Sequence, residues 1–179
     1  NQKFELIECS GVLHHMEDPI QGLFKLTESL EQNGVLKLGL YSKYAREDIL
    51  KARELIKERG IESSVEEIKL FRNDVFKGNL QGLKDISSWS DFYSTSMCRD
   101  LCFHKQEKCY SLLEIRDMLE KTNLEFLGFT LNQNLRDKFL SQGYNYNSLK
   151  NLELWNDFEK SNKKSFREMY QFWTRKSIK

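Results

Sequence analysis

Residues 4–41 read FELIECSGVLHHMEDPIQGLFKLTESLEQNGVLKLGLY, and they predict a strand, a helix and a second strand in that order. The first strand covers residues 4–9 and breaks at Ser10-Gly11. Val35-Leu36-Lys37-Leu38-Gly39-Leu40-Tyr41 is the clearest strand of the chain. Because a strand–helix–strand unit joins parallel strands through a right-handed crossover, this run predicts an α/β fold.

The helix between these strands has its own start and stop signals. Asp18-Pro19 is typical of a helix start, because Asp caps free amides and Pro fits the first turn. Leu23, Leu26 and Leu30 give the helix an apolar face. Asn33-Gly34 is expected to end it, where a residue in the left-handed region is needed.

The remaining residues continue the alternation of helices and strands. The patterns predict a helix over 43–59 closed by Gly60, a capped helix from Ser63 or Ser64 to about 77, and a loop with a short helix over 78–89. An irregular segment over 91–110 is expected next, followed by a helix that the capping box Ser111–Glu114 opens. The last elements are a strand over 124–129, mainly helix over 132–168 with a break at 143–147, and a strand over 169–176.

Composition narrows the class of protein. The chain has 179 residues, with 28 Lys and Arg against 27 Asp and Glu, so no nucleic-acid or membrane partner is expected. No apolar run approaches the roughly 20 residues of a bilayer span, and no signal peptide is visible. The four cysteines are too few for a disulfide framework, which favours a reduced, cytoplasmic protein. Since the chain opens at Asn1 without Met, we expect a fragment.

Two segments resemble class I S-adenosylmethionine-dependent methyltransferases. Residues 4–19 resemble the fourth strand of that family and the loop after it, F-D-x-I-x-x-x-x-V-L-H-H-x-x-D-P. Residues 30–40 resemble the L-K-P-G-G-x-L turn into strand five. Glu5 stands where Asp is usual, and Gln32-Asn33 replaces Lys-Pro.

The resemblance continues in order to the C-terminus. Residues 110–129 are similar to the last helix and sixth strand of the family, and residues 170–176 to the antiparallel seventh strand. Residues 91–107 resemble a D-F-Y-S-x-S-x-C-R-D-L-x-F-H-x-Q-E block of methyltransferase modules that occur with tetratricopeptide repeats. The resemblance therefore implies a partial Rossmann-like sheet of order 4-5-7-6, with helices inserted after strand five, and residues 1–179 as a single domain.

The resemblance implies methyl transfer from S-adenosylmethionine to an unknown acceptor, a small molecule or a protein. The G-x-G-x-G turn of the family and the acid after its second strand have no counterpart here. We therefore expect this chain alone to bind no cofactor, or only weakly, and to be inactive by itself. The alternative is a non-catalytic assembly or scaffold domain, and cofactor binding discriminates between the two.

Ligands of parallel sheets bind outside the carboxyl ends of the strands. Residues that leave the first strand are therefore expected to line the cofactor site, namely Cys9, Ser10, Gly11, Val12 and Leu13. The alternative is that Val12 and Leu13 are core residues and Gly11 only turns the chain. His14 or His15 is a candidate general base, with capping or packing near the helix start as the alternative.

The block of residues 91–107 is the candidate for acceptor recognition, because loops that combine polar and aromatic groups are often functional. Within it we expect His104 and Glu107 to be catalytic and a second set to bind the substrate, namely Tyr93, Cys98, Arg99 and Gln106. The alternative is a solvated connection. A zinc site of three cysteines and one histidine is conceivable from Cys98, Cys102, His104 and Cys109, but their spacing is unusual and no metal is expected.

The first strand also predicts a partner. With no strand one in the chain, residues 4–8 are expected to present unpaired backbone groups, and such edges pair with other chains. We therefore expect a homodimer across this strand. Lys3, Glu5 and Glu8 argue mildly against it, since charges blunt an edge.

Overall fold

The computed structural model describes residues 2–104 and 106–177, which form two compact units. Residues 2–45 and 106–177 make a sheet unit, and residues 46–104 make a helical unit. Each is described by itself. The expectation that residues 1–179 are one domain stays a prediction, because two compact units can belong to one domain.

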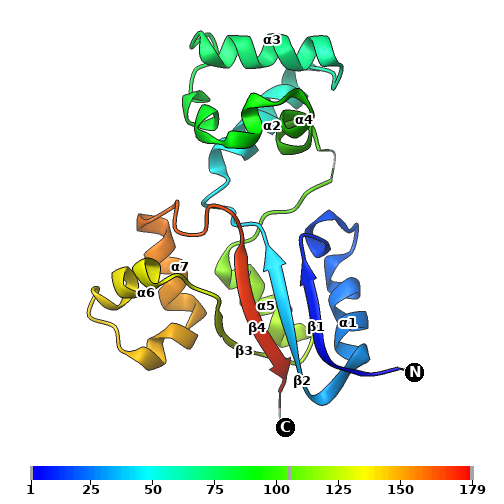
Figure 1. Ribbon diagram of the computed structural model, residues 1–179, viewed down its shortest axis with the longest axis vertical. Coiled ribbons are helices and arrows are strands. Elements are labelled where there is room, and N and C mark those ends of the chain that lie inside the picture. The colour runs from blue at the N-terminus through cyan, green and yellow to red at the C-terminus, as the bar shows by residue number, and fades with distance from the viewer. Residues whose placement is uncertain (1, 105, 178–179) are drawn as a thin grey trace. The chain divides into compact units, whose positions relative to one another are not determined.

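The sheet unit contains four strands (Figure 1). They are β1 (Phe4–Ser10), β2 (Leu30–Leu40), β3 (Leu124–Phe129) and β4 (Tyr170–Lys176), in the spatial order β1-β2-β4-β3. β1 pairs with β2 in parallel, whereas β4 runs antiparallel to both β2 and β3. The predicted 4-5-7-6 order with an antiparallel last strand is therefore confirmed.

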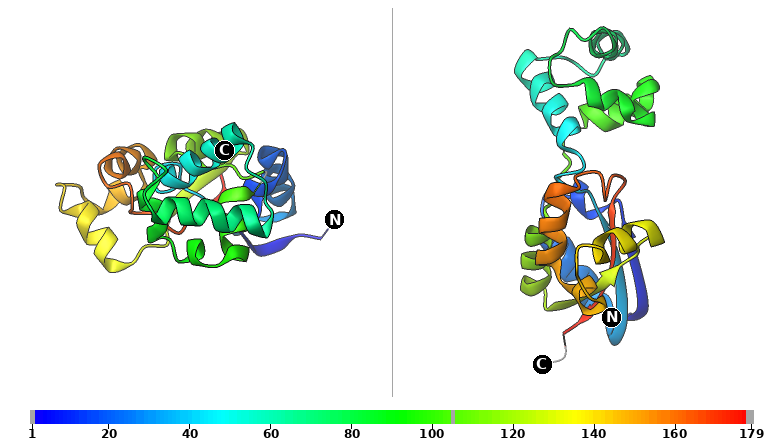
Figure 2. Two further views of the ribbon diagram at one scale, coloured as in Figure 1. Left: turned by 90° about the horizontal axis from the view of Figure 1, so that it is seen from above. Right: turned by 90° about the vertical axis from the view of Figure 1, so that its left-hand side faces the viewer.

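One face of this sheet carries the core. Leu36, Leu38 and Leu40 of β2 are buried there, and Leu38 pairs with Phe172 of β4. Their cluster includes buried side chains from the four helices of the unit, α1 (Pro19–Ser29), α5 (Leu112–Lys121), α6 (Gln133–Leu140) and α7 (Leu152–Ser161). Figure 2 shows α5 and α7 along the same side of the sheet. The opposite face exposes Phe4 and Leu6, by 44% and 58%.

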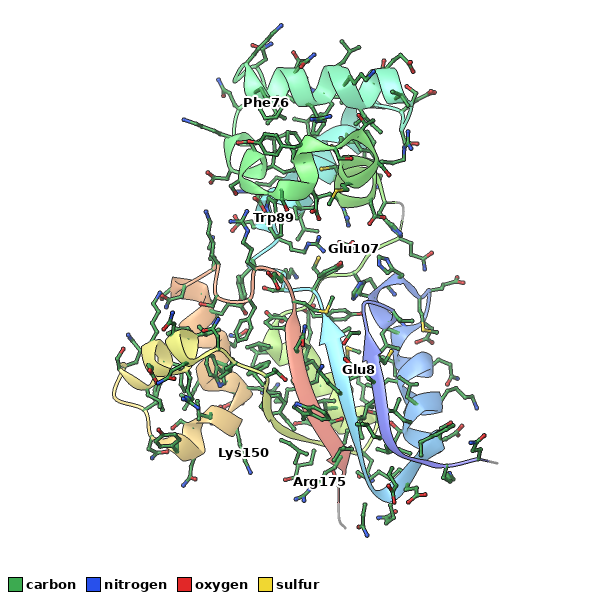
Figure 3. All side chains as sticks on the ribbon, in the orientation of Figure 1. Glu8, Phe76, Trp89, Glu107, Lys150 and Arg175 are labelled. Carbon is green, nitrogen blue, oxygen red and sulfur yellow. The ribbon has the colours of Figure 1, made fainter. Side chains whose placement is uncertain are left out.

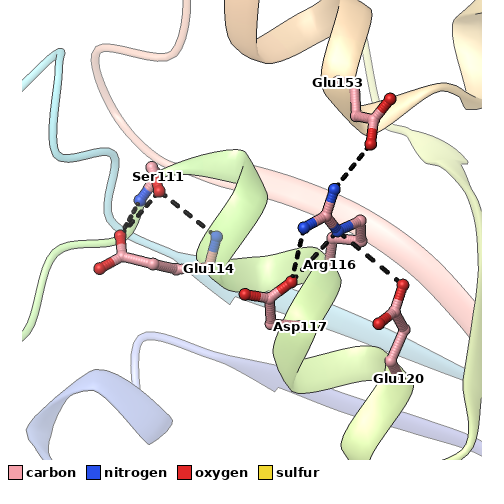
Figure 4. Close-up of polar contacts among 6 residues, drawn as sticks. All are labelled: Ser111, Glu114, Arg116, Asp117, Glu120 and Glu153. Atoms are coloured by element: carbon pink, nitrogen blue, oxygen red, sulfur yellow. Dashed lines mark hydrogen bonds and ion pairs between the residues drawn. The ribbon is translucent and has the colours of Figure 1, made fainter.

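The α5 helix shows how local sequence and packing combine. Ser111 and Glu114 form the predicted capping box at its start (Figure 4). Arg116 donates to Glu153 of α7 at 2.7 Å, which joins two elements far apart in the sequence. Because these charges are exposed, we assign them roughly 0–1 kcal/mol and assign most of the stability to the apolar face below.

The first helix ends earlier than the sequence predicts. Asp18 caps α1 as expected, but α1 stops at Ser29, and Leu30 already belongs to β2. The Asn33-Gly34 pair lies inside β2, so Gly34 does not end a helix. A Cβ atom on Gly34 would lie 3.0 Å from the carbonyl oxygens of both Phe4 and Glu5. Glycine at this position therefore permits the close approach of β1 to β2.

The helical unit contains α2 (Glu47–Arg59), α3 (Val65–Phe76) and α4 (Thr95–Phe103), with the short 3-10 turns Lys84–Ser88 and Ser90–Tyr93. Gly60 ends α2 at φ 63°, and Ser64 caps α3, as the sequence predicts. This unit has its own apolar cluster, which includes Ile49, Phe71 and Phe92.

Two expectations about this unit are wrong. The α2 helix begins at Glu47 rather than Lys43, because Ala45 donates its amide to the Ser42 hydroxyl instead of entering a helix. The segment predicted to be irregular is helical over 95–103, where Ser94 caps α4. The helix is short, and its buried positions include two cysteines, so its apolar period is weak in the sequence. A helix with the length and apolarity of a bilayer span is absent from the part of the chain described.

Candidate functional site

The carboxyl ends of the parallel strands β1 and β2 are where ligands of such sheets bind. Gly11 follows β1 directly, with φ 75°, a conformation that favours glycine. Its amide donates to the Gly39 carbonyl of β2 at 3.3 Å. A Cβ atom built on Gly11 would meet nothing within 4 Å, so the backbone faces open space at the carboxyl edge of the sheet.

The side chains around Gly11 divide into an exposed and a buried set. Ser10 is exposed and Val12 is 53% exposed, whereas Cys9 and Leu13 are buried in the core. Burial raises the pKa of the Cys9 thiol, against a smaller opposite effect of a backbone hydrogen bond from Leu13. The thiol is therefore neutral near pH 7. The alternative that Val12 and Leu13 are core residues therefore holds for Leu13 but not for Val12. The role of residues 9–13 in cofactor binding stays a prediction.

Three rings cluster beside this loop. The His14 ring is 4.1 Å from the Tyr41 ring and 4.3 Å from the His15 ring, between centroids. The exposed fraction of His14 is 0%, so an acceptor in solvent does not reach this imidazole. The backbone amide of Lys108 donates to the His14 carbonyl at 2.9 Å, which ties the returning chain to the loop. The role of His14 as a general base stays a prediction.

A buried polar triad lies near the ends of β2 and β4. The Ser42 hydroxyl donates to Oε1 of Glu159, and the Tyr170 hydroxyl donates to Oε2, each at 2.5 Å. Burial raises the pKa of the Glu159 carboxyl to about 7, although its two donors favour the charged form. Burial and the charge of Glu159 raise the pKa of the Tyr170 hydroxyl.

Glu159 is a residue that sequence reasoning missed. It lies in α7, close in sequence to the exposed charged residues Asp157 and Lys160, so the adjacent residues do not indicate that it is buried. The signal was the helical period, since Leu152, Trp155 and Glu159 share the buried face of α7.

The helical unit contains a cavity of about 540 Å³. Two of the predicted residues, Arg99 and His104, line it together with Ser63, Asp91, Ser96, Met97, Asp100 and Phe103. Arg99 is positioned by its Nε–H, which donates to the Ser63 carbonyl at 3.0 Å. The cavity therefore combines both signs of charge with apolar walls.

The other residues of the predicted acceptor block lie elsewhere. Cys98 is buried in the core of the helical unit, where a hydrogen bond from Cys102 lowers the pKa of its thiol. Tyr93 is exposed and contacts Phe76, at 5.5 Å between ring centroids. Gln106 and Glu107 belong to the sheet unit, and Figure 3 labels Glu107 on the returning segment. The block thus spans two units, and the roles of its residues stay predictions.

No group of three or more His, Cys, Asp or Glu side chains is arranged to hold a metal within residues 2–104 and 106–177. Of the residues weighed for zinc, Cys98, Cys102 and His104 lie in the helical unit, whereas Cys109 lies in the sheet unit.

Comparison with known proteins relates the chain to longer ones. No family model matches it. A 135-residue stretch is 30% identical to an uncharacterised protein of Synechococcus sp., covering 72% of this chain and 32% of that protein. The structure of PKMT2 from Rickettsia typhi matches with a TM-score of 0.66 at 16% identity, over 98% of this chain and 36% of that one. The structure of PKMT2 in complex with AdoHcy matches with a TM-score of 0.64 at 15% identity, over 99% and 36%.

The chain thus spans about a third of the length of these proteins. At such low identity the structural matches show the fold alone. That fold is the α/β, partial Rossmann-like fold that the sequence predicts.

Proposed function

We propose that this chain is part of an S-adenosylmethionine-dependent methyltransferase and that the loop from Cys9 to Leu13 forms one wall of its cofactor site. The observation that carries this proposal is the open backbone of Gly11 at the carboxyl end of β1, in a sheet of order β1-β2-β4-β3. A structure with a similar fold is a complex with AdoHcy, which supports the choice of ligand.

The residues of the loop fit such a cofactor. The space in front of Gly11 lets a ligand approach the main chain, and the exposed Val12 side chain offers apolar contact beside it. When bound, S-adenosylmethionine supplies a methyl group on a positively charged sulfur. The contribution of this loop is to position that group and to exclude water around it, because displacement at carbon depends chiefly on alignment.

We propose that the cavity of the helical unit recognises part of the acceptor, because it brings together Arg99 and His104 with apolar walls. Methyl transfer joins the acceptor lone pair to the methyl carbon, and the S–C bonding pair stays on the sulfur. The proton that the acceptor loses needs a base. Since His14 is buried and His104 lines this cavity, we propose His104 for this role, and the catalytic role of Glu107 in the sheet unit stays a prediction. The identity of the acceptor does not follow from the fold.

Two glycines allow a matched test of the cofactor wall. Gly11 and Gly78 have φ values of 75° and 74°, and a Cβ atom on either would meet nothing within 4 Å. Each Gly→Ala change therefore adds the same backbone strain, but only Gly11→Ala places a methyl group in the proposed site. In the full-length gene product that carries this sequence, calorimetry with S-adenosylhomocysteine should show roughly tenfold weaker binding for Gly11→Ala, a loss of about 1.4 kcal/mol. Gly78→Ala should bind with the affinity of the wild type.

Equal affinities of the two variants would contradict the assignment of Cys9–Leu13. If the full-length product binds neither S-adenosylmethionine nor S-adenosylhomocysteine, the assembly or scaffold alternative replaces the enzyme. The isolated 179-residue chain is a separate case, because it lacks the glycine-rich turn and the ribose-binding acid. Its dissociation constant for either ligand should be weaker than about 10 μM, and a lower value would show that these motifs are dispensable.

A further inference from the structure

The chain leaves the sheet unit through residues 41–45 and returns through residues 106–110. These segments pair with each other. Lys43 donates its amide to the Tyr110 carbonyl, and Tyr110 donates its amide to the Tyr41 carbonyl, each at 2.8 Å. Ser42 and Tyr110 form a parallel bridge. We call this pair of segments the stem. It extends β2 beyond the last residue of the sheet.

One hydroxyl of the stem bonds to a helix of the core. Ser42 accepts the amide of Ala45 at 2.9 Å and donates its own proton to Glu159 of α7 at 2.5 Å. The second oxygen of Glu159 accepts from Tyr170, the first residue of β4. All three side chains of this triad are buried. One carboxyl group therefore connects the outgoing chain, a helix and a strand, at the end of the sheet where the candidate site lies.

The stem also borders the rings of the candidate site. The Tyr41 carbonyl is held by Tyr110, and the Tyr41 ring lies 4.1 Å from the buried His14 ring. The amide of Lys108 in the returning segment donates to the His14 carbonyl. A shift of the stem would therefore move Tyr41 and Lys108 together, and both contact the loop after β1.

From these contacts we propose that Glu159 is a positioning residue: it fixes the stem against the core through Ser42, and through the stem it holds Tyr41 against His14. Its two hydrogen bonds reach Ser42 and Tyr170, so it acts on the loop of the proposed cofactor wall through other residues. The proposal does not depend on methyl transfer, since it concerns the geometry of the sheet unit alone. A buried carboxyl group that receives two donors is costly to replace, because its removal leaves the Ser42 and Tyr170 hydroxyls without an acceptor.

Amide hydrogen exchange in the full chain tests this proposal directly. Glu159→Gln keeps the size of the side chain but replaces one of the two accepting oxygens with an NH2 donor. We expect the amides of Lys43, Ala45 and Tyr110 to exchange roughly tenfold faster in this variant, while amides of the β2–β4 ladder keep their rates. The ring proton resonances of His14 should shift in the same variant.

Thr174→Val provides the matched control, because Thr174 is buried in the same unit and its hydroxyl donates to the Leu36 carbonyl at 3.2 Å, within the ladder. This variant should leave the stem amides and the His14 resonances unchanged. Ser42→Ala removes the link from the other side and should reproduce the faster exchange if Glu159→Gln does not fold. Unchanged stem amides in the folded variant, unmoved His14 resonances, or equal acceleration in the Thr174→Val control would each overturn the proposal.

Discussion

At the scale of single residues, the buried carboxyl of Glu159 predicts a pH dependence of stability. The pKa is raised from 4.5 to about 7 in the folded chain, so the neutral form is favoured by folding. The stabilisation that follows is fully present below about pH 4.5 and is lost as the pH rises through 7. The total loss of this stabilisation across the range is roughly 3 kcal/mol.

Urea unfolding of the wild type and of Glu159→Gln at pH 5 and pH 8 checks this sign. The free energy of unfolding of the wild type should fall relative to that of the variant between the two pH values, because glutamine does not ionise. Parallel pH profiles would show that Glu159 does not titrate in this range.

His104 carries a second prediction at this scale. Its side chain lines the cavity of the helical unit at the C-terminal end of α4, outside the apolar cluster of that unit. In the full-length product, His104→Ala should change turnover of the acceptor while the melting temperature stays nearly constant. Phe103→Ala serves as the comparison, because Phe103 packs on Phe71 and should lower the melting temperature. A large loss of stability in His104→Ala without a kinetic effect would make the residue structural.

At the scale of elements, the strands and most helix starts could be predicted because their signals are local. Ser64, Ser111 and Asp18 each cap the helix that follows them, as their spacing indicates. The end of α1 was missed because Leu30 continues the apolar spacing of the helix, while the contact that makes it a strand lies in β1. The Ser42–Glu159 bond joins residues 117 positions apart, so no local pattern could reveal it.

Gly34 tests the close approach of β1 and β2. In Gly34→Ala the new methyl group would lie 3.0 Å from two backbone oxygens that cannot move without breaking the sheet register, so we expect a loss of roughly 1–3 kcal/mol of stability. In the comparison variant Gly22→Ala, the nearest atom is the flexible Met16 sulfur, and alanine favours the helix. Chemical unfolding should therefore place Gly34→Ala well below Gly22→Ala. Equal stability of the two would mean that the strands separate freely.

At the scale of the whole molecule, the sequence indicated a helical insertion after the second strand but not that it forms a unit with its own core. Separate cores are recognised from contacts between α2, α3 and α4, and the helical pattern of each one alone does not show which partner it has. In the sheet unit, β1 and β3 are the two edges of the described sheet, and either edge could pair with another chain.

We propose that two copies of the chain pair across β1. This edge strand carries Phe4 and Leu6, exposed by 44% and 58%, and an edge strand with exposed apolar side chains attracts another strand. The charges on β1 oppose such pairing, but Glu8 already forms an ion pair with Lys37 at 2.9 Å. A two-fold axis beside Leu6 would join the sheets of two copies, and closed pairs are the commonest oligomers.

Light scattering at tens of micromolar should therefore give twice the 21.3 kDa mass of the chain. Leu6→Pro should shift the mass toward that of the monomer, because proline removes a backbone donor from β1. Leu127→Pro places a proline on β3, the other edge of the sheet, at the register shift between Phe126 and Gly128, and should leave the dimer intact. A monomeric wild type would reject the dimer. A dimer that survives Leu6→Pro but not Leu127→Pro would move its interface to β3.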